Sequence, residues 1–149
     1  MLRAAVLAIA ISALAGMTFT GASAQNLEAI KARKALLKEM ADATKKPGAM
    51  MKQETPFDPA PVKAALAKFQ ANAPKIAALF PDDSKTGGET EALPSIWEKK
   101  ADFTERFEKL AAAAKAAETS ITDEFSFQEE WPKVVGNCGG CHKQYRKDK

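Results

Sequence analysis

The sequence FQEEWPKVVGNCGGCHKQY, residues 127–145, decides which fold the chain can adopt. Its large apolar and cysteine side chains recur at intervals of 4, 3, 4, 3 and 4 residues, at Phe127, Trp131, Val134, Cys138, Cys141 and Tyr145. Residues three and four apart share one face of an α-helix. We therefore expect a helix that buries this face, with both cysteines on the buried side.

A five-residue motif near the end of this stretch carries the chemistry. Cys138, Cys141 and His142 form the pattern C-x-x-C-H, and they are the only two cysteines and the only histidine of the chain. This pattern attaches c-type haem, because the two thiols add to the vinyl groups of one porphyrin and the histidine ligates its iron. The motif predicts one haem c, bound covalently through two thioethers, with His142 as an axial ligand.

Two other interpretations of the cysteines are weaker. A C-x-x-C pair that exchanges thiols and disulfides normally occurs in a βαβ context, which this sequence lacks. A structural zinc site needs four strong ligands, and no further cysteine or histidine is present to complete one.

The composition of the chain favours an all-α fold. The sequence is rich in Ala, Lys, Glu and Leu, has few β-branched runs and has no Asn-Gly hairpin signal. Four helical stretches fit between the turn signals. We therefore expect a four-helix bundle with the haem on its last helix, facing the interior.

The first two helices have clear boundaries in the sequence. One is predicted from about Asn26 to Lys45, ended by Pro47-Gly48. The next begins with Asp58 as its cap and Pro59 in its first turn. Pro74 lies inside the second helix, where we expect it to kink the helix without abolishing its seam. That seam is Val62, Leu66, Phe69, Ala73, Ile76 and Phe80.

The last two helices follow a long polar connection over residues 81–91. Ser95–Glu98 has the pattern of a capping box and predicts the start of the third helix. Its seam is Phe103, Phe107, Leu110, Ala114 and Ala117. Pro132 is expected in the first turn of the fourth helix, where its missing N–H costs little.

Residues 1–24 have the features of a secretory signal peptide. Arg3 supplies a positive charge, Ala4–Ala15 is an apolar segment, and Ala22-Ser23-Ala24 is a small-residue cleavage site. The apolar segment is shorter than the roughly 20 residues that a membrane span requires. We therefore expect export, cleavage before Gln25, no membrane attachment afterwards, and one domain over residues 25–149.

The charge balance argues against a nucleic-acid partner. The whole chain has a net charge of +3, and Arg3 is the only charged residue of the predicted signal, which leaves +2 for the remainder. Basic residues are spread along the chain and do not gather in one block, unlike those of a nucleic-acid-binding surface.

With these features in place, the chain resembles the cytochrome c′ family, the class-II c-type cytochromes that include cytochrome c-556. The matching segments are RKALLK at 33–38, PFD at 56–58, GGET at 87–90, ALPSIW at 92–97 and CGGCHKQYR at 138–146. Class-I cytochromes carry C-x-x-C-H near the N-terminus, whereas here it lies on the last helix. The resemblance covers essentially the whole chain after residue 24.

The resemblance implies an architecture, a location and partners. It implies a left-handed antiparallel four-helix bundle in the periplasm, usually a homodimer, that exchanges electrons with redox partner proteins. It assigns Cys138, Cys141 and His142 to the haem. It also places Arg146 beside the proximal face and Arg33 near the haem edge, where it can balance a propionate. Tyr145 is expected to pack near the haem.

The sixth coordination position of the iron separates the functions within this family. The resemblance places Leu37 over the distal face, where some relatives have a methionine ligand. Leucine has no lone pair, so we expect five-coordinate iron under an apolar lid that NO or CO can displace. The alternative is a low-spin electron carrier of the c-556 type with Met40 as sixth ligand, one turn beyond Leu37. Met50 and Met51 are expected to be core or loop residues.

Catalysis is the least favoured function. A peroxidase needs a distal acid–base residue, and Leu37 together with the single histidine argues against one. The sequence therefore predicts a redox-active or gas-binding haem protein and not an enzyme.

Overall fold

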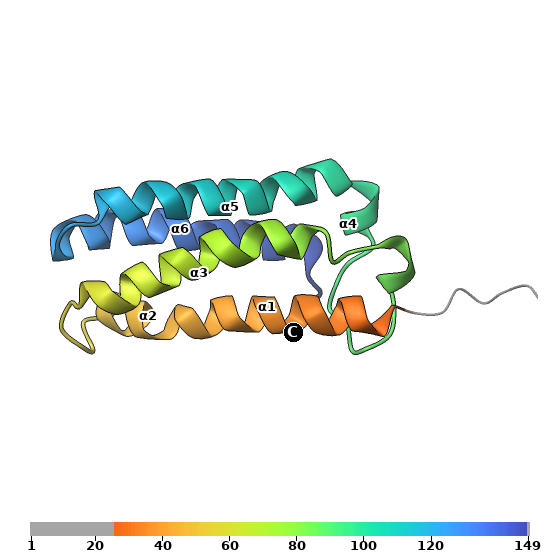
Figure 1. Ribbon diagram of the computed structural model, residues 1–149, viewed down its shortest axis with the longest axis horizontal. Helices are drawn as coiled ribbons and strands as arrows, with labels where there is room; N and C mark the ends of the chain where they lie inside the picture. The colour runs from red at the N-terminus through yellow and green to blue at the C-terminus, as the bar shows by residue number, and fades with distance from the viewer. Residues whose placement is uncertain (1–25, 149) are drawn as a thin grey trace, which may run out of the picture.

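The computed structural model describes residues 26–148, which form a helical protein (Figure 1). The elements in chain order are α1 (Leu27–Ala43), α2 (Lys45–Met51), α3 (Pro59–Ala77), the 3-10 helix η1 (Asp82–Ser84), α4 (Ser95–Glu98), α5 (Lys100–Ser120) and α6 (Glu124–Tyr145). A single bridge between Ala92 and Arg146 is the only isolated β-type pairing in this part of the chain. The predicted signal peptide lies outside the described residues.

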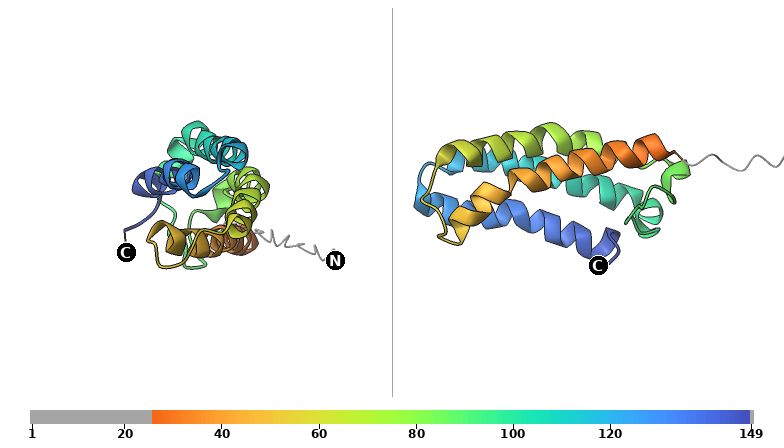
Figure 2. Two further views of the ribbon diagram at one scale, coloured as in Figure 1. Left: turned by 90° about the vertical axis from the view of Figure 1, so that its left-hand side faces the viewer. Right: turned by 90° about the horizontal axis from the view of Figure 1, so that it is seen from below.

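Four long helices make the body of the molecule. α1, α3, α5 and α6 alternate in direction along the bundle (Figure 1), and the end-on view in Figure 2 places them around a common core. α3 packs against α1 and α5, and α5 packs against α6. α1 and α6 do not pack closely against each other, so the fourth side of the bundle is open. The predicted all-α four-helix bundle is confirmed.

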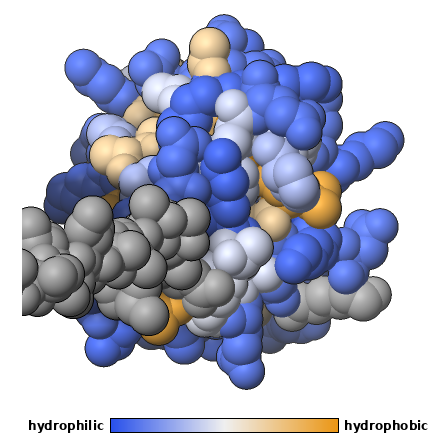
Figure 3. All heavy atoms as spheres, turned by 90° about the vertical axis from the view of Figure 1, so that its right-hand side faces the viewer, coloured by the Kyte–Doolittle hydropathy of each residue, from blue (hydrophilic) through white to orange (hydrophobic). Residues whose placement is uncertain are grey.

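The surface of the bundle is mainly polar at the end near α4 and the start of α1. Figure 3 shows this end covered mostly by hydrophilic side chains, with a few hydrophobic ones between them. Within residues 26–148, no helix combines the length and the apolar composition needed to cross a bilayer.

The first helix ends differently from the prediction. Asn26 caps α1 as expected, since its side chain accepts a hydrogen bond from the Ala29 N–H at 2.9 Å. However, Pro47-Gly48 does not end the helical region. Both residues lie in α2, which follows α1 after Thr44. Pro47 fits there because it occupies the first turn, where backbone N–H groups have no partner within the helix.

The second predicted helix corresponds to α3. Asp58 caps it by accepting a hydrogen bond from the Ala60 N–H at 2.9 Å, and Pro59 is its first residue, both as predicted. Pro74 lies inside the helix, which continues to Ala77. The seam therefore persists through the proline.

The predicted capping box at Ser95–Glu98 is wrong. Ser95 begins only the short helix α4, and its hydroxyl donates to the Gln144 carbonyl at 2.8 Å instead of capping. The long helix α5 starts afterwards, at Lys100. Trp97 holds α4 in place, because its indole N–H donates to two carbonyls in the connection after α3. Tertiary bonds thus separate two segments that the sequence pattern predicts as one helix.

The start of α6 also differs from the prediction. Asp123 and Ser126 form a capping box, with the Ser126 N–H donating to the Asp123 carboxylate at 2.8 Å. Pro132 therefore lies about two turns inside the helix and not in its first turn. It removes the N–H that would bond to the Gln128 carbonyl. The helix survives because the neighbouring Trp131 is 2% exposed and packed in the core.

The core follows the predicted seams of α3, α5 and α6. Phe69 from α3 stacks against Trp131 of α6 with ring centroids 6.0 Å apart, and Trp131 also packs against Phe127. The largest side chains with less than 2% exposure are Phe69, Phe127, Ile30, Leu66, Ile76, Ile96, Val62 and Val134. The two cysteines are half-buried, and Cys141 packs against the edge of this core.

Arg33 anchors the long connection between α3 and α4. The side chain is 2% exposed, and its guanidinium lies 4.2 Å from the Phe80 ring centroid. Nη1 donates to the Leu79 carbonyl and to the Ser84 hydroxyl, at 3.2 and 2.8 Å. Nη2 donates to the Ser84 carbonyl at 3.0 Å and to the Thr90 hydroxyl at 2.7 Å. The predicted surface loop is therefore pinned to α1, and Ser84 is fully buried.

Replacing Arg33 tests this anchor. Arg33→Met removes four hydrogen bonds and leaves buried oxygens without donors, so we expect the free energy of unfolding to fall by roughly 2–4 kcal/mol. Urea denaturation of the holoprotein measures the change. Lys34→Met is the matched control, since Lys34 is exposed, and we expect it to change stability by about 0.5 kcal/mol or less. Equal losses for both variants would contradict the anchoring role.

Candidate haem-binding cleft

A cleft occupies the open side of the bundle. It has a volume of about 990 Å³ and lies mainly between α1 and α6, with side chains of α3 and α5 at its floor. Its floor includes the aromatic rings of Phe69, Phe103, Phe107 and Trp131. A large, mostly apolar hollow with a few polar groups at its rim is typical of a cofactor site.

The C-x-x-C-H residues all line this cleft from α6. Cys138 and Cys141 are half-buried free thiols, one helical turn apart, and His142 follows on the same side. The helix brings the three side chains together because positions i, i+3 and i+4 share a face. Two thiols and an imidazole on one wall of an apolar cleft fit a porphyrin bound through two thioethers and one axial ligand.

Burial sets the protonation of these groups. It raises the pKa of the Cys141 thiol to about 11 and also raises the pKa of the Cys138 thiol. Burial lowers the pKa of His142, and the charge of Arg146 lowers it further, against a smaller opposite effect of Glu91. At neutral pH the imidazole is therefore neutral, which is the form that binds a metal.

The α1 wall carries the candidate distal residues. Leu37 is half-buried, Met40 is 6% exposed, and both line the cleft. Met50 and Met51 are absent from its lining; Met50 is 7% exposed in the core and Met51 packs against it. Of the methionines in the described residues, Met40 alone reaches the cleft.

The predicted arginines lie at one end of the cleft. Arg33 and Arg146 both line it, but each already has protein partners: Arg33 bonds to the connection after α3, and Arg146 pairs with Glu91 at 2.6 Å. The contact between Arg33 and a haem propionate stays a prediction. The structure gives this arginine a second role as an anchor.

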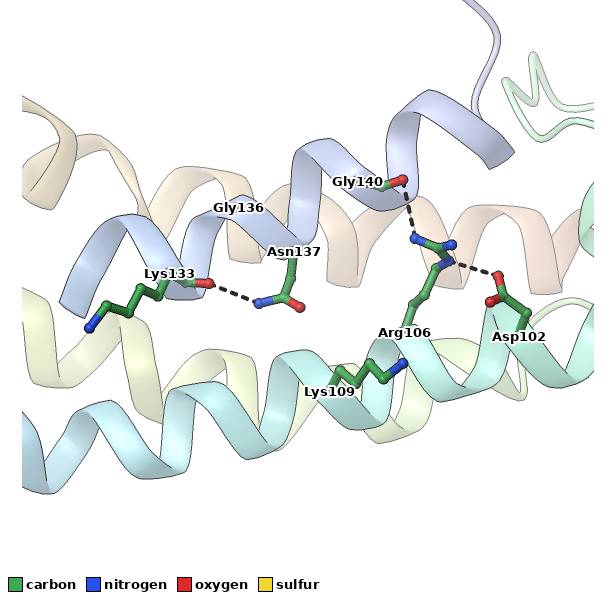
Figure 4. Close-up of a pocket in the computed structure, with 7 residues that line it drawn as sticks. All are labelled: Asp102, Arg106, Lys109, Lys133, Gly136, Asn137 and Gly140. Carbon is green, nitrogen blue, oxygen red and sulfur yellow. Dashed lines mark hydrogen bonds and ion pairs between the residues drawn. The ribbon is translucent and has the colours of Figure 1, made fainter. Parts of the chain in front are cut away.

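Tyr145 is part of a network that sequence reasoning missed. It is 3% exposed, lines the cleft and packs edge-on against Phe103, and its hydroxyl donates to the Asp102 carboxylate. Arg106 donates from Nε to the same carboxylate at 2.8 Å and from Nη1 to the Gly140 carbonyl at 3.3 Å. Figure 4 shows Arg106 crossing from α5 to α6 beside a polar groove of about 320 Å³.

This network ties α5 to the haem-attachment segment. The i, i+4 spacing of Asp102 and Arg106 predicts an ion pair between them. Only the packing of α5 on α6 shows that the pair also reaches Tyr145 and Gly140. Tyr145 and Arg106 lower the pKa of the Asp102 carboxyl.

The bundle and its cleft together define a class of protein. An all-helical domain with C-x-x-C-H on its last helix, both thiols and the imidazole facing one apolar cleft, is a c-type haem protein of the bundle type.

Comparisons with known proteins place the chain in a family. The family model described as Cytochrome C' matches residues 28–146. Cytochrome c' of Rhodopseudomonas palustris is 47% identical over 141 residues, covering 93% of this chain and 97% of that protein. Cytochrome c-556 of Agrobacterium fabrum is 33% identical over 118 residues, covering 78% of this chain and 80% of that protein. The chain belongs to the cytochrome c′ family.

Solved structures agree with this assignment. A structure of cytochrome c′ from R. palustris matches with a TM-score of 0.80 at 51% identity, covering 81% of this chain and 97% of that one. An NMR-validated structural model of oxidised R. palustris cytochrome c556 matches with a TM-score of 0.75 at 27% identity, covering 82% of this chain and 98% of that one. Relatives named c′ and relatives named c-556 thus share this fold.

The raised thiol pKa values predict slow alkylation before haem is attached. With a pKa of about 11, about one Cys141 thiol in a thousand is ionised at pH 8, against about a quarter of the thiols at an unperturbed pKa. We expect iodoacetamide to react slowly with the folded haem-free chain and its rate to rise up to about pH 11. Mass spectrometry of the 134–143 peptide follows the reaction. The urea-unfolded chain is the control, and a plateau near pH 9 in the folded chain would contradict the effect of burial.

Proposed function

We propose that this protein is an exported, periplasmic cytochrome c′ with five-coordinate, high-spin iron that binds NO and CO under Leu37. Electron transfer with redox partner proteins is a companion activity of the same haem. The observation that carries the proposal is the position of Leu37 on the α1 wall of the cleft, across from the α6 wall that holds His142.

The chain's own residues fit this function. The haem, when bound, supplies an iron that changes redox state and takes a diatomic ligand. Cys138 and Cys141 would hold the porphyrin on α6, and the neutral imidazole of His142 would ligate its iron. The aromatic rings at the floor of the cleft offer an apolar surface to the porphyrin.

Two apolar side chains on the α1 wall, Leu37 and Met40, favour NO and CO over O₂. The side chains of Leu37 and Met40 have no hydrogen-bond donor, so bound O₂, which is polarised, gains no stabilisation from them. NO and CO bind without that help. The same lack of an acid–base group on these side chains argues against peroxidase chemistry.

The second candidate is a low-spin electron carrier with Met40 as the sixth ligand. Met40 is buried, lines the same cleft as Leu37, and lies one turn from it on α1. Several relatives of 31–35% identity are named cytochrome c-556. With Met40 as sixth ligand, the iron would have no free coordination position for a gas.

Location and assembly are also part of the proposal. The signal-like residues 1–24 and the covalent attachment of haem support a periplasmic protein. The resemblance to cytochrome c′ supports a homodimer and redox partner proteins. No nucleic-acid partner and no membrane attachment after cleavage are proposed, in line with the charge of +2 after residue 24.

Leu37→Ala tests the lid directly. Removing the side chain opens the distal face, so we expect the rate constant for CO association with the reduced protein to rise about tenfold, equivalent to about 1.4 kcal/mol of barrier. Stopped-flow absorption measures it. Leu36→Ala is the matched control, because Leu36 is also half-buried but does not line the cleft. A rate that is the same in both variants and in the wild type would rule out the lid.

Met40→Leu separates the two candidates. Under the five-coordinate proposal, the ferric and reduced absorption spectra stay high-spin and unchanged, because Met40 is not a ligand. Under the alternative, the wild type has sharp low-spin bands insensitive to CO, and Met40→Leu loses them. Met50→Leu is the control, since it changes a buried methionine outside the cleft.

A further inference from the structure

Besides the Asp102–Arg106 pair, a second ion pair lies close in the chain to His142, the predicted axial ligand. Glu91, in the connection before α4, accepts from Nε and from Nη2 of Arg146, both at 2.6 Å. The side chain of Arg146 is 35% exposed and that of Glu91 is 49% exposed, so solvent only partly screens the pair. Both residues line the cleft.

The backbone around this pair is also fixed. The Lys147 N–H donates to the Glu91 carbonyl at 2.8 Å, and the Leu93 N–H donates to the Tyr145 carbonyl at 3.0 Å. The bridge between Ala92 and Arg146 lies between these two bonds. The connection is therefore held across the end of α6, and Glu91 is held against Arg146.

Arg146 is in turn close to His142. The Arg146 N–H donates to the His142 carbonyl at 3.0 Å, one helical turn away, and both side chains line the cleft. Because Arg146 is paired with Glu91, the cleft wall next to His142 carries a compensated pair and not a lone guanidinium.

We propose that Glu91 is a positioning residue for the haem iron: it holds and neutralises Arg146 beside His142, and so lowers the reduction potential of the site. This inference rests on the proposed haem ligation by His142. Reduction adds an electron to the iron, so a nearby positive charge favours the reduced state. Removing the Glu91 charge leaves Arg146 uncompensated and should make reduction easier.

The test is a redox titration of the holoprotein. In Glu91→Gln the amide oxygen can still accept from Arg146, so the charge is lost while the connection keeps its contacts. We expect the equilibrium constant for reduction to rise roughly threefold to tenfold, the order of effect that one nearby charge has under partial screening. Amide hydrogen exchange at Lys147 reports whether the backbone contact to Glu91 survives.

Glu89→Gln is the matched control. It removes the same charge two residues away on the same connection. Glu89 also lines the cleft, but its side chain is 97% exposed to solvent and lies 4.0 Å from Lys34, and it is not paired with Arg146. We expect less than a twofold change. If Glu89→Gln and Glu91→Gln shift the equilibrium equally, or if neither shifts it, the positioning role is wrong.

A double-mutant cycle with Arg146→Met tests whether the guanidinium acts on the iron. Arg146→Met removes the positive charge, so we expect it to lower the equilibrium constant for reduction, opposite to Glu91→Gln, and we expect the double variant to lie near the sum because the fields of two fixed charges add. If Arg146→Met leaves the constant unchanged or raises it, the guanidinium does not act on the iron and the proposal is overturned.

The outcome of the redox titration does not depend on whether the protein binds gases. A redox titration works for high-spin and low-spin iron alike, whereas the spectrum of the wild type with CO decides the proposed function. If CO does not change the spectrum of the wild type, five-coordinate iron is refuted, but the role proposed for Glu91 is unaffected. If Glu91→Gln does not shift the redox equilibrium, the proposal that the iron binds CO is unaffected.

Discussion

The separation of α1 from α6 is the constraint on which the rest of the structure depends. Three sides of the bundle close by helix packing, and the fourth leaves apolar side chains along a cleft of about 990 Å³. Apolar surface left in water costs about 25 cal/mol per Å². The proposed haem, a flat and mostly apolar group, would relieve that cost if Cys138 and Cys141 held it on α6. It would then complete the core as well as supply the chemistry.

Three arginines hold the elements that frame this cleft. Arg33 ties α1 to the connection after α3, Arg106 ties α5 to Gly140 on α6, and Arg146 ties the end of α6 to Glu91. A guanidinium suits this task because it presents five donors in a fixed plane and remains charged when buried. All three arginines line the cleft, so the bonds that fix its shape also set the charge around it.

The sequence predicted the seams of α3, α5 and α6 and the common face of Cys138, Cys141 and His142, because both depend on spacing along one helix. The predicted starts of the last two helices were wrong because contacts between distant residues set them. The bonds of Trp97 hold α4 apart from α5, and core packing keeps Pro132 two turns inside α6. The Tyr145–Asp102 contact and the Glu91–Arg146 pair join residues that lie 43 and 55 positions apart. No periodicity relates residues so distant, and only the folded chain brings them together.

The register of α1 bears on which residue meets the iron. Leu37 and Met40 are three residues apart, so exchanging them requires α1 to slide by about 4.5 Å along its axis and to rotate. Two sets of bonds oppose such a slide: the Asn26 N–H donates to the Asp83 carbonyl at 2.9 Å, and Arg33 makes its bonds to the same connection. Breaking several buried hydrogen bonds without replacement costs about 1–3 kcal/mol for each unsatisfied group. A methionine–iron bond would have to offset that loss, and this balance favours Leu37 as the distal residue.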